Sequence, residues 1–313
     1  MRLVIALAAA LTLLTTPAMA QWKPSGPIKM MISFSPGGTA DTLARLIGEE
    51  MEARAGWKVI PETVAGKGGN VLAAKLKNEP ADGTSIGLIT DQIGYAVLAE
   101  KDPGFAPGDF AYLTTVAGTQ TGLVAKASKG WKTLADVVKD AKGGKKLVVG
   151  ALSPMYADAL YLLGKHLKVN FNIVNFKGGN SVQNAILAGD IDMGFLAGVQ
   201  RRGVESGTLV NIVSGERSRL KMTPDAPTLS ESGFPVDLGA RFLFAAPKAL
   251  KPEAKQALTK LIVDIVQDPK SKAHGFITKS LGDPVVIQGA DLDKLIADSF
   301  AQAKMLLSKE GAN

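Results

Sequence analysis

The stretch FSPGGTADTLARL, residues 34–46, decides the fold that we expect. It begins at the end of an apolar run, Ile28 to Phe34, which is typical of a buried strand. A Ser-Pro-Gly-Gly turn leads from this run into Thr39 to Met51, where apolar residues recur at helical spacing. A strand that turns directly into a helix is the first half of a βαβ unit. The stretch therefore predicts an α/β protein with a glycine-rich loop between strand and helix.

The same alternation of short apolar runs and helix-period segments continues along the chain. A first series predicts strands at 58–64 and 84–90 and a helix at 71–78. A second series predicts strands at 146–150, 172–176, 191–196 and 209–214, and helices at 155–167 and 181–188. Strands that alternate with helices in this way indicate mostly parallel sheets flanked by helices. Two series predict two α/β lobes.

Two extended segments without a helix of their own, 114–125 and 241–246, are predicted to cross between the lobes at a hinge. On this division residues 21–121 and 241–313 form lobe 1, and residues 122–240 form lobe 2. The C-terminal segment is mainly helical and has too few strands for a third domain, so we expect it to pack back on the first sheet.

Residues 1–20 have the layout of a secretory signal peptide. Arg2 is followed by an apolar run from Leu3 to Leu14 and then by an Ala-x-Ala pattern, which predicts cleavage between Ala20 and Gln21. The apolar run is too short for a membrane anchor, which needs roughly 20 residues. We therefore expect a protein exported to the periplasm.

Composition excludes several classes of protein. The chain has no cysteine, so disulfides, thiolate metal sites and cysteine nucleophiles are excluded. Its formal net charge is +7, but the lysines are scattered and aromatic residues make up only 6%, which is unlike a nucleic-acid-binding protein. The phosphate-loop, nucleophile-elbow and zinc-protease motifs are missing. We predict no nucleic-acid partner, metal, cofactor or catalytic residue.

Glycine-rich loops follow the carboxyl ends of five predicted strands. In open α/β sheets, ligands bind in the crevice outside these ends, so the five loops are expected to converge on one cleft between facing lobes. The candidate ligand-binding residues on them are Ser35, Pro36, Gly37, Gly38, Thr39, Asp41, Asp91, Gln92, Ala151, Ser153, Met155, Tyr156, Lys177, Gly178, Ala197 and Gly198.

The first of these loops suits an anion. Gly37 and Gly38 let the backbone approach a ligand, and the amides at the start of the helix are free in a place where the helix dipole favours negative charge. A second interpretation stays open, in which Thr39 caps the helix and Asp41 is a first-turn acid that satisfies the dipole. Asp41 would oppose an anion unless it pairs with an ammonium group or organises water.

Four blocks of sequence, in order and with matching spacing, resemble the Bug-type substrate-binding proteins of tripartite tricarboxylate transporters. They are FSPGGTADTLARLIGEEM (34–51), VIPETVAGKGGNVLAAKLKNEPADGTSIGLIT (59–90), VNFKGGNSVQNAILAGDIDMGFLAG (174–198) and DAPTLSESGFPVDLGARFLFAAPKAL (225–250). The resemblance implies a two-lobed periplasmic binding protein, a Venus flytrap, that closes about a hinge on a small ligand. It also implies that two loops, Ser35 to Asp41 and Gly150 to Tyr156, hold a carboxylate, and that an acid at Asp41 can meet an amino group.

The second of these loops departs from the family pattern. Where the family usually has a Gly/Ser-rich stretch with a nearby histidine, this chain has GALSPMYADAL, residues 150–160. We therefore expect a mono- or dicarboxylate with an apolar or aromatic body that packs against Met155 and Tyr156. In the alternative, both side chains are buried under the lobe. Lys177 either complements an anion or only fixes its loop.

The resemblance implies a receptor that captures an organic acid and delivers it to integral membrane transporter subunits without catalysing a reaction. We expect this receptor to be a monomer. Two alternatives stay open. One is a periplasmic enzyme that uses Asp41, Asp91 or Asp158 as acid or base in the same cleft. The other is a sensor-type receptor that engages a signalling partner in the membrane.

Overall fold

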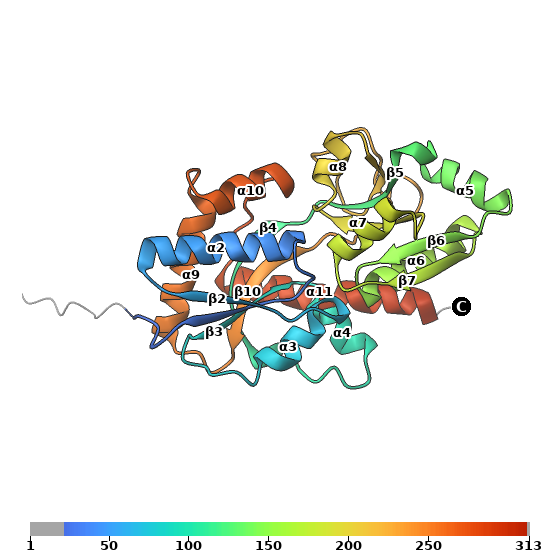
Figure 1. Cartoon of the computed structure of the whole chain (residues 1–313). Helices are drawn as coiled ribbons and strands as arrows, with labels where there is room; N and C mark the ends of the chain where they lie inside the picture. Colours follow the sequence, from blue (N-terminus) through green and yellow to red (C-terminus); the bar gives the residue numbers. More distant parts are fainter. Residues whose placement is uncertain (1–21, 312–313) are drawn as a thin grey trace, which may run out of the picture.

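A computed structural model describes residues 22–311, which form two lobes side by side with a long C-terminal helix that extends from the first lobe to the second (Figure 1). The predicted signal peptide and its cleavage site lie outside the described residues. Within residues 22–311, no helix combines the length and apolar character needed to cross a membrane.

The first lobe is built on a five-stranded sheet in the order β2-β1-β3-β10-β4. Its strands are β1 (Ile28–Ile32), β2 (Val59–Thr63), β3 (Ser85–Thr90), β4 (Phe110–Gly118) and β10 (Arg241–Pro247). One face packs on α2 (Thr39–Ala55), α9 (Pro252–Gln267) and α10 (Lys272–Ser280). The other face packs on α3 (Asn70–Leu76), α4 (Ile93–Ala99) and the beginning of α11 (Gly289–Gly311).

The second lobe repeats this arrangement with the order β7-β6-β8-β5-β9. Its strands are β5 (Thr121–Lys126), β6 (Leu147–Ala151), β7 (Phe171–Asn175), β8 (Met193–Ala197) and β9 (Leu209–Ser214). Its helices are α5 (Leu134–Lys142), α6 (Pro154–Leu167), α7 (Gly179–Ala188) and α8 (Arg201–Glu205). The matching strand orders place the carboxyl ends of both parallel sets at the boundary between the lobes.

The predicted two-lobed α/β architecture is confirmed, with one difference in the sheets. β10 and β5 run antiparallel to both of their neighbours, so each sheet is mixed and only its remaining βαβ strands are parallel. The reason is that each of these two strands enters its sheet directly from the hinge, at the carboxyl ends of the parallel strands, and so runs the opposite way. The predicted lobe boundaries, 121/122 and 240/241, stay a prediction.

The C-terminal segment packs on the first sheet as expected, but its last helix also reaches the second lobe. Leu292 and Ile296, near the start of α11, belong to a core cluster of the first lobe. Ala303 and Leu306, two turns later, belong to the core of the second lobe. With 23 residues at 1.5 Å each, α11 is about 34 Å long, so a single apolar stripe reaches both lobes.

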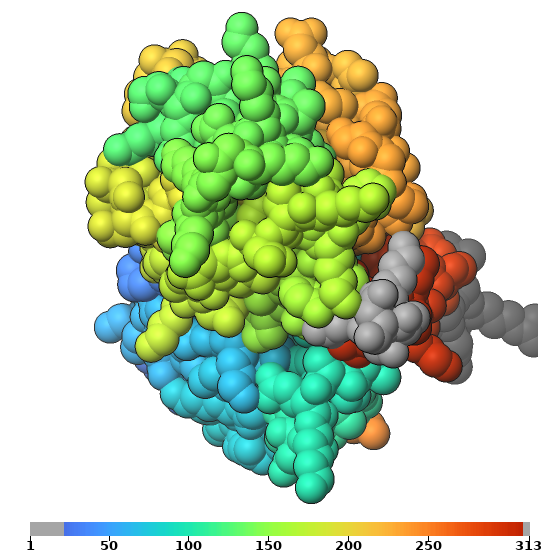
Figure 2. Space-filling view, turned by 90° about the vertical axis from the view of Figure 1, so that its right-hand side faces the viewer, coloured from blue at the N-terminus to red at the C-terminus, as the bar shows by residue number. Residues whose placement is uncertain are grey.

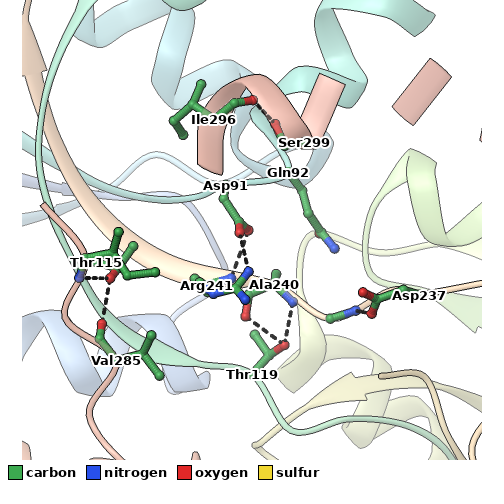
Figure 3. A network of polar contacts seen from close by, with 12 residues as sticks. Asp91, Gln92, Thr115, Thr119, Asp237, Ala240, Arg241, Val285, Ile296 and Ser299 are labelled. Carbon is green, nitrogen blue, oxygen red and sulfur yellow. Dashed lines mark hydrogen bonds and ion pairs between the residues drawn. The ribbon is translucent and has the colours of Figure 1, made fainter. Parts of the chain in front are cut away.

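The two chain crossings are tied together at Thr119 and Ala240. The N–H of Thr119 donates to the Ala240 carbonyl at 2.9 Å, and the N–H of Ala240 donates to the Thr119 hydroxyl at 2.9 Å (Figure 3). Glu216 accepts from the Thr119 hydroxyl at 3.0 Å and from the N–H of Thr121 at 2.7 Å. These bonds hold the two crossings together at the place that we call the hinge.

Burial raises the pKa of Glu216 to about 7, and nearby Asp237 adds to the rise, whereas the bonds from Thr121 and Thr119 and the charge of Arg241 oppose it. The ordinary value is 4.5, so folding takes up a proton between pH 4.5 and about 7. The stabilisation by protonated Glu216 is complete below this window and is lost as the pH rises through it.

We expect Glu216→Gln, which stays neutral, to flatten the pH dependence of the free energy of unfolding between pH 4.5 and 7.5. A single proton changes that slope by at most about 1.4 kcal/mol per pH unit. Denaturant titrations at several pH values measure the slope, with Glu253→Gln at an exposed glutamate of α9 as the matched control. Equal slopes in wild type and Glu216→Gln would contradict the assignment.

Candidate functional site

Loops of the two lobes contact each other directly along the boundary. The N–H of Ser35 donates to the Lys177 carbonyl at 3.1 Å, and the Thr39 hydroxyl donates to the Ala197 carbonyl at 3.1 Å. The side-chain amide of Asn180 adds a bond of 3.0 Å to the carbonyl of Pro36. The seam is visible from the end of the molecule, where the yellow-green second lobe lies against the blue first lobe (Figure 2). The structure therefore represents a closed arrangement of the lobes.

This closeness depends on glycines at two places. Gly178 has φ of +140°, and a Cβ there would lie 2.9 Å from the hydroxyl oxygen of Ser35. Gly68, in the turn before α3, has φ of +68°, and its Cβ would lie 2.7 Å from the Cβ of Ser153. Any larger residue would both strain the backbone and hold the loops apart.

A cavity of about 40 Å³, which we call the inner cavity, lies between these loops. It is lined by residues from both lobes and from both crossings: Phe34, Gly38, Thr39, Ala40, Thr90, Gln92, Thr119, Leu152, Tyr156, Gly179, Ala197, Val199, Ala240 and Phe242.

The inner cavity has an electropositive wall made by the beginning of α2. Gly38, Thr39 and Ala40 line it, and the first intrahelical bond is donated by Thr42 to the Gly38 carbonyl. The N–H groups of Thr39 and Ala40 precede that bond and so have no partner within the helix. Together with the helix dipole they favour an anionic group.

Asp41 does not line this cavity. It is only 5% exposed, and its carboxylate accepts from the N–H of Gly37 at 3.0 Å and from Nε of Arg45 at 3.0 Å. The acid therefore holds the glycine turn in place, and Arg45 balances its charge. This geometry favours one half of the second interpretation from the sequence, that of a structural first-turn acid. The other half is wrong, because the N-cap of α2 is Gly38 and the Thr39 hydroxyl donates to Ala197 instead of capping the helix.

Gln92 and Tyr156 meet at one backbone carbonyl. Nε2 of Gln92 and the Tyr156 hydroxyl both donate to the carbonyl of Leu238, each at 2.9 Å. The Tyr156 ring is buried and packs against Phe195 with ring centroids 5.5 Å apart. Both residues also line the inner cavity, so together they form one of its walls.

Both carboxylate oxygens of Asp91 are bonded within the first lobe. Its carboxylate accepts from the backbone N–H of Arg241 at 2.8 Å and from the guanidinium of Arg241 at 3.3 Å (Figure 3). Burial raises the pKa of Asp91 to about 6, although the bonds and charge of Arg241 lower it in part. The carboxyl group thus anchors the start of β10 at the hinge.

A larger cavity of about 140 Å³ lies next to the inner cavity at Gln92, and we call it the hinge cavity. It is lined by Asp91, Gln92, Tyr95, Met155, Arg217, Pro235, Val236, Asp237, Gly239, Ser299, Gln302, Ala303, Met305 and Leu306. Gln92 lines both cavities. The closing wall of the hinge cavity is α11.

The structure brings most of the predicted site residues to the boundary but divides them among three spaces. Those on the inner cavity are Gly38, Thr39, Gln92, Tyr156 and Ala197. Those on the hinge cavity are Asp91, Gln92 and Met155. Gly37, Gly38, Thr39 and Gly198 line an outer recess that also includes Arg201 and Arg202. Those that line none of the three are Ser35, Pro36, Asp41, Ala151, Ser153, Lys177 and Gly178. The Lys177 side chain is exposed, and its loop contact is made by the backbone.

Several residues of the inner cavity were not predicted from the sequence. Phe34, Leu152 and Phe242 supply its apolar surface, and Thr119 and Ala240 supply its floor at the hinge. Thr119 lies within the predicted crossing segment 114–125 and Ala240 directly precedes the other, 241–246, so these segments were an available signal. The apolar residues have no such signal, because their patterns match those of ordinary strand ends.

The described residues contain no group of three or more metal-ligating side chains. Of the three acids considered for catalysis, only Asp91 lines one of these cavities, and Asp158 has interaction partners of its own. The acids do not converge on one space.

The chain matches the family described as "Tripartite tricarboxylate transporter family receptor" over residues 43–312. Protein BugT of Bordetella pertussis is 25% identical, over 96% of this chain and 94% of its own length.

Two solved structures share the fold. R. palustris Rpa4515 with adipate has a TM-score of 0.81 at 20% identity, covering 92% of this chain and 98% of that chain. MatC (Rpa3494) from Rhodopseudomonas palustris with bound malate has a TM-score of 0.80 at 22% identity, covering 91% and 99%. The resemblance seen in the sequence is confirmed. Because the family match spans most of the chain, this protein belongs to the tripartite tricarboxylate transporter receptor family of solute-binding proteins.

Proposed function

We propose that this protein is a monomeric periplasmic receptor that binds a small organic acid in the inner cavity and delivers it to a membrane transporter. The observation that carries the proposal is the inner cavity itself, which draws on loops of both lobes and has the start of α2 as one wall. A carboxylate there would accept from the amides of Thr39 and Ala40. The solved relatives with adipate and malate support a carboxylate as the ligand class.

Closure of the lobes is the working step of this receptor. A ligand held by both lobes stabilises the closed form by the difference between its affinities for the closed and open forms. Three bonds between the lobes, from Ser35, Thr39 and Asn180, form only when the loops meet. The membrane partner then binds the surface that only the closed form presents. No covalent bond of the ligand is broken.

A panel of carboxylates, amino acids and cationic amines in a thermal-shift assay tests the ligand class. We expect at least one carboxylate to raise the melting temperature, because a ligand at 100 times its Kd adds about 2.7 kcal/mol of stability. The ligand recovered afterwards should be chemically unchanged. No response to any carboxylate would refute the proposal, and a converted ligand would point to an enzyme.

Thr39→Val removes a bond between the lobes but leaves the shape of the cavity. We expect carboxylate affinity to fall about 5- to 10-fold, as for the loss of one hydrogen bond of about 1 kcal/mol. Thr42→Val, one turn along on α2, is the matched control, because Thr42 lies off the inner cavity. Isothermal titration calorimetry measures both, and equal affinities would contradict a role for Thr39 in closure.

Asp41→Ala separates the two interpretations of this acid. If Asp41 only holds the loop, the Gly37 N–H loses its acceptor, stability falls by about 1–3 kcal/mol, and all carboxylates bind more weakly to a similar extent. A loss restricted to amino-acid ligands would instead show that Asp41 meets an ammonium group. Titration with matched pairs such as malate and aspartate distinguishes the outcomes.

A further inference from the structure

The inner cavity is too small for most of an organic acid. A space of about 40 Å³ holds only a few water-sized groups, since each needs roughly 10–15 Å³. That is enough for a carboxylate and its neighbouring carbon. The hinge cavity, at about 140 Å³, is more than three times as large and lies behind the side chain of Gln92.

Among the described residues, Gln92 is the one that lines both cavities, and its amide shares an acceptor with Tyr156. Gln92 and Tyr156 both donate to the Leu238 carbonyl, which can keep one donor if the other turns away. Gln92 is partly exposed and lies on both cavities, whereas Tyr156 is packed in the core. Rotation of the Gln92 amide would therefore join the cavities without unpacking the second lobe.

The hinge cavity has apolar walls and one buried polar group that lacks a partner within the described part of the chain. Met155, Val236, Ala303 and Leu306 supply apolar surface. Tyr95 also lines it, is 5% exposed, and has a buried hydroxyl without a hydrogen-bond partner. A buried hydroxyl left unpaired is costly, so a ligand group that accepts from it would gain a favourable bond.

The charges around this cavity are already balanced. Asp91 is paired with Arg241, and Asp237 is paired with Arg217 at 2.7 Å. A second carboxylate placed here would have no free cation to meet and would lie beside two acids. A neutral hydroxyl or carbonyl carries no such penalty.

We infer that the hinge cavity is the specificity chamber of this receptor, and that its ligand is an elongated monocarboxylate with a neutral polar end. This inference rests on the proposed function, because the carboxylate is held in the inner cavity. The chain of the acid passes Gln92 and packs against Met155, and its distal hydroxyl or carbonyl accepts from Tyr95.

Calorimetric titration of the full mature chain with four acids tests this assignment: propionate, hexanoate, 6-hydroxyhexanoate and adipate. We expect 6-hydroxyhexanoate to bind most tightly. Tyr95→Phe should weaken 6-hydroxyhexanoate about 5-fold and leave hexanoate and propionate unchanged, because it removes only the hydroxyl.

A second variant fills the chamber from its half-buried wall. Gln302→Trp on α11 should weaken both of the monocarboxylates with six carbons by tenfold or more and leave propionate unchanged. Lys304→Trp, at an exposed position of the same helix that lines neither cavity, is the matched control and should bind all four acids as wild type does.

The outcomes separate this inference from the function on which it rests. If wild type binds propionate, and Gln302→Trp binds the six-carbon acids as wild type does, the chamber is overturned and the proposed function stands. Tighter binding of adipate than of 6-hydroxyhexanoate overturns the neutral end. Failure of all four acids to bind overturns the chamber, and the proposed function falls with it only if no carboxylate of the thermal-shift panel binds either.

Discussion

The reciprocal pairing of Thr119 and Ala240 is the constraint on which the rest of the structure depends. Two chain crossings meet there through two backbone N–H donors, one answered by a carbonyl and one by a hydroxyl. β5 and β10 leave this point in opposite directions and enter their sheets at the carboxyl ends of the parallel strands. The ligand-facing loops of both lobes are therefore brought to the same boundary, with the hinge pair as the floor of the inner cavity.

α11 adds a second constraint that the chain crossings do not supply. Because its apolar stripe packs on a first-lobe cluster and then on the second-lobe core, any opening of the lobes must slide or tilt this helix. The hinge cavity lies under that helix, between its residues Ser299 to Leu306 and the segment Arg217 to Gly239. Its volume is accordingly coupled to lobe position, which makes it a suitable place to sense the length of a ligand.

Sequence alone predicted the elements better than the site. β1, α2 and the loop between them followed from residues 34–46, because strand and helix periods are local and a Pro-Gly-Gly turn is a strong signal. The mixed sheets and the reach of α11 did not follow, since both depend on which distant segments meet. Met155 and Tyr156 were predicted to pack against one ligand, yet they line different cavities, and nothing in their local pattern distinguishes the two sides.

Asp41 lies close to the proposed anion site without opposing an anion, because Arg45 balances its charge. One carboxylate oxygen of Asp41 accepts from Arg45 and the other accepts from the Gly37 N–H. The side chain therefore holds the turn without facing the cavity. The same pattern recurs at the hinge, where Asp91 and Asp237 are each paired with an arginine. Local neutralisation leaves the uncompensated amides of α2 as the main electrostatic feature of the inner cavity. On the proposed function, selectivity for an anion would therefore come from backbone groups, and selectivity among anions from the uncharged surface beyond them.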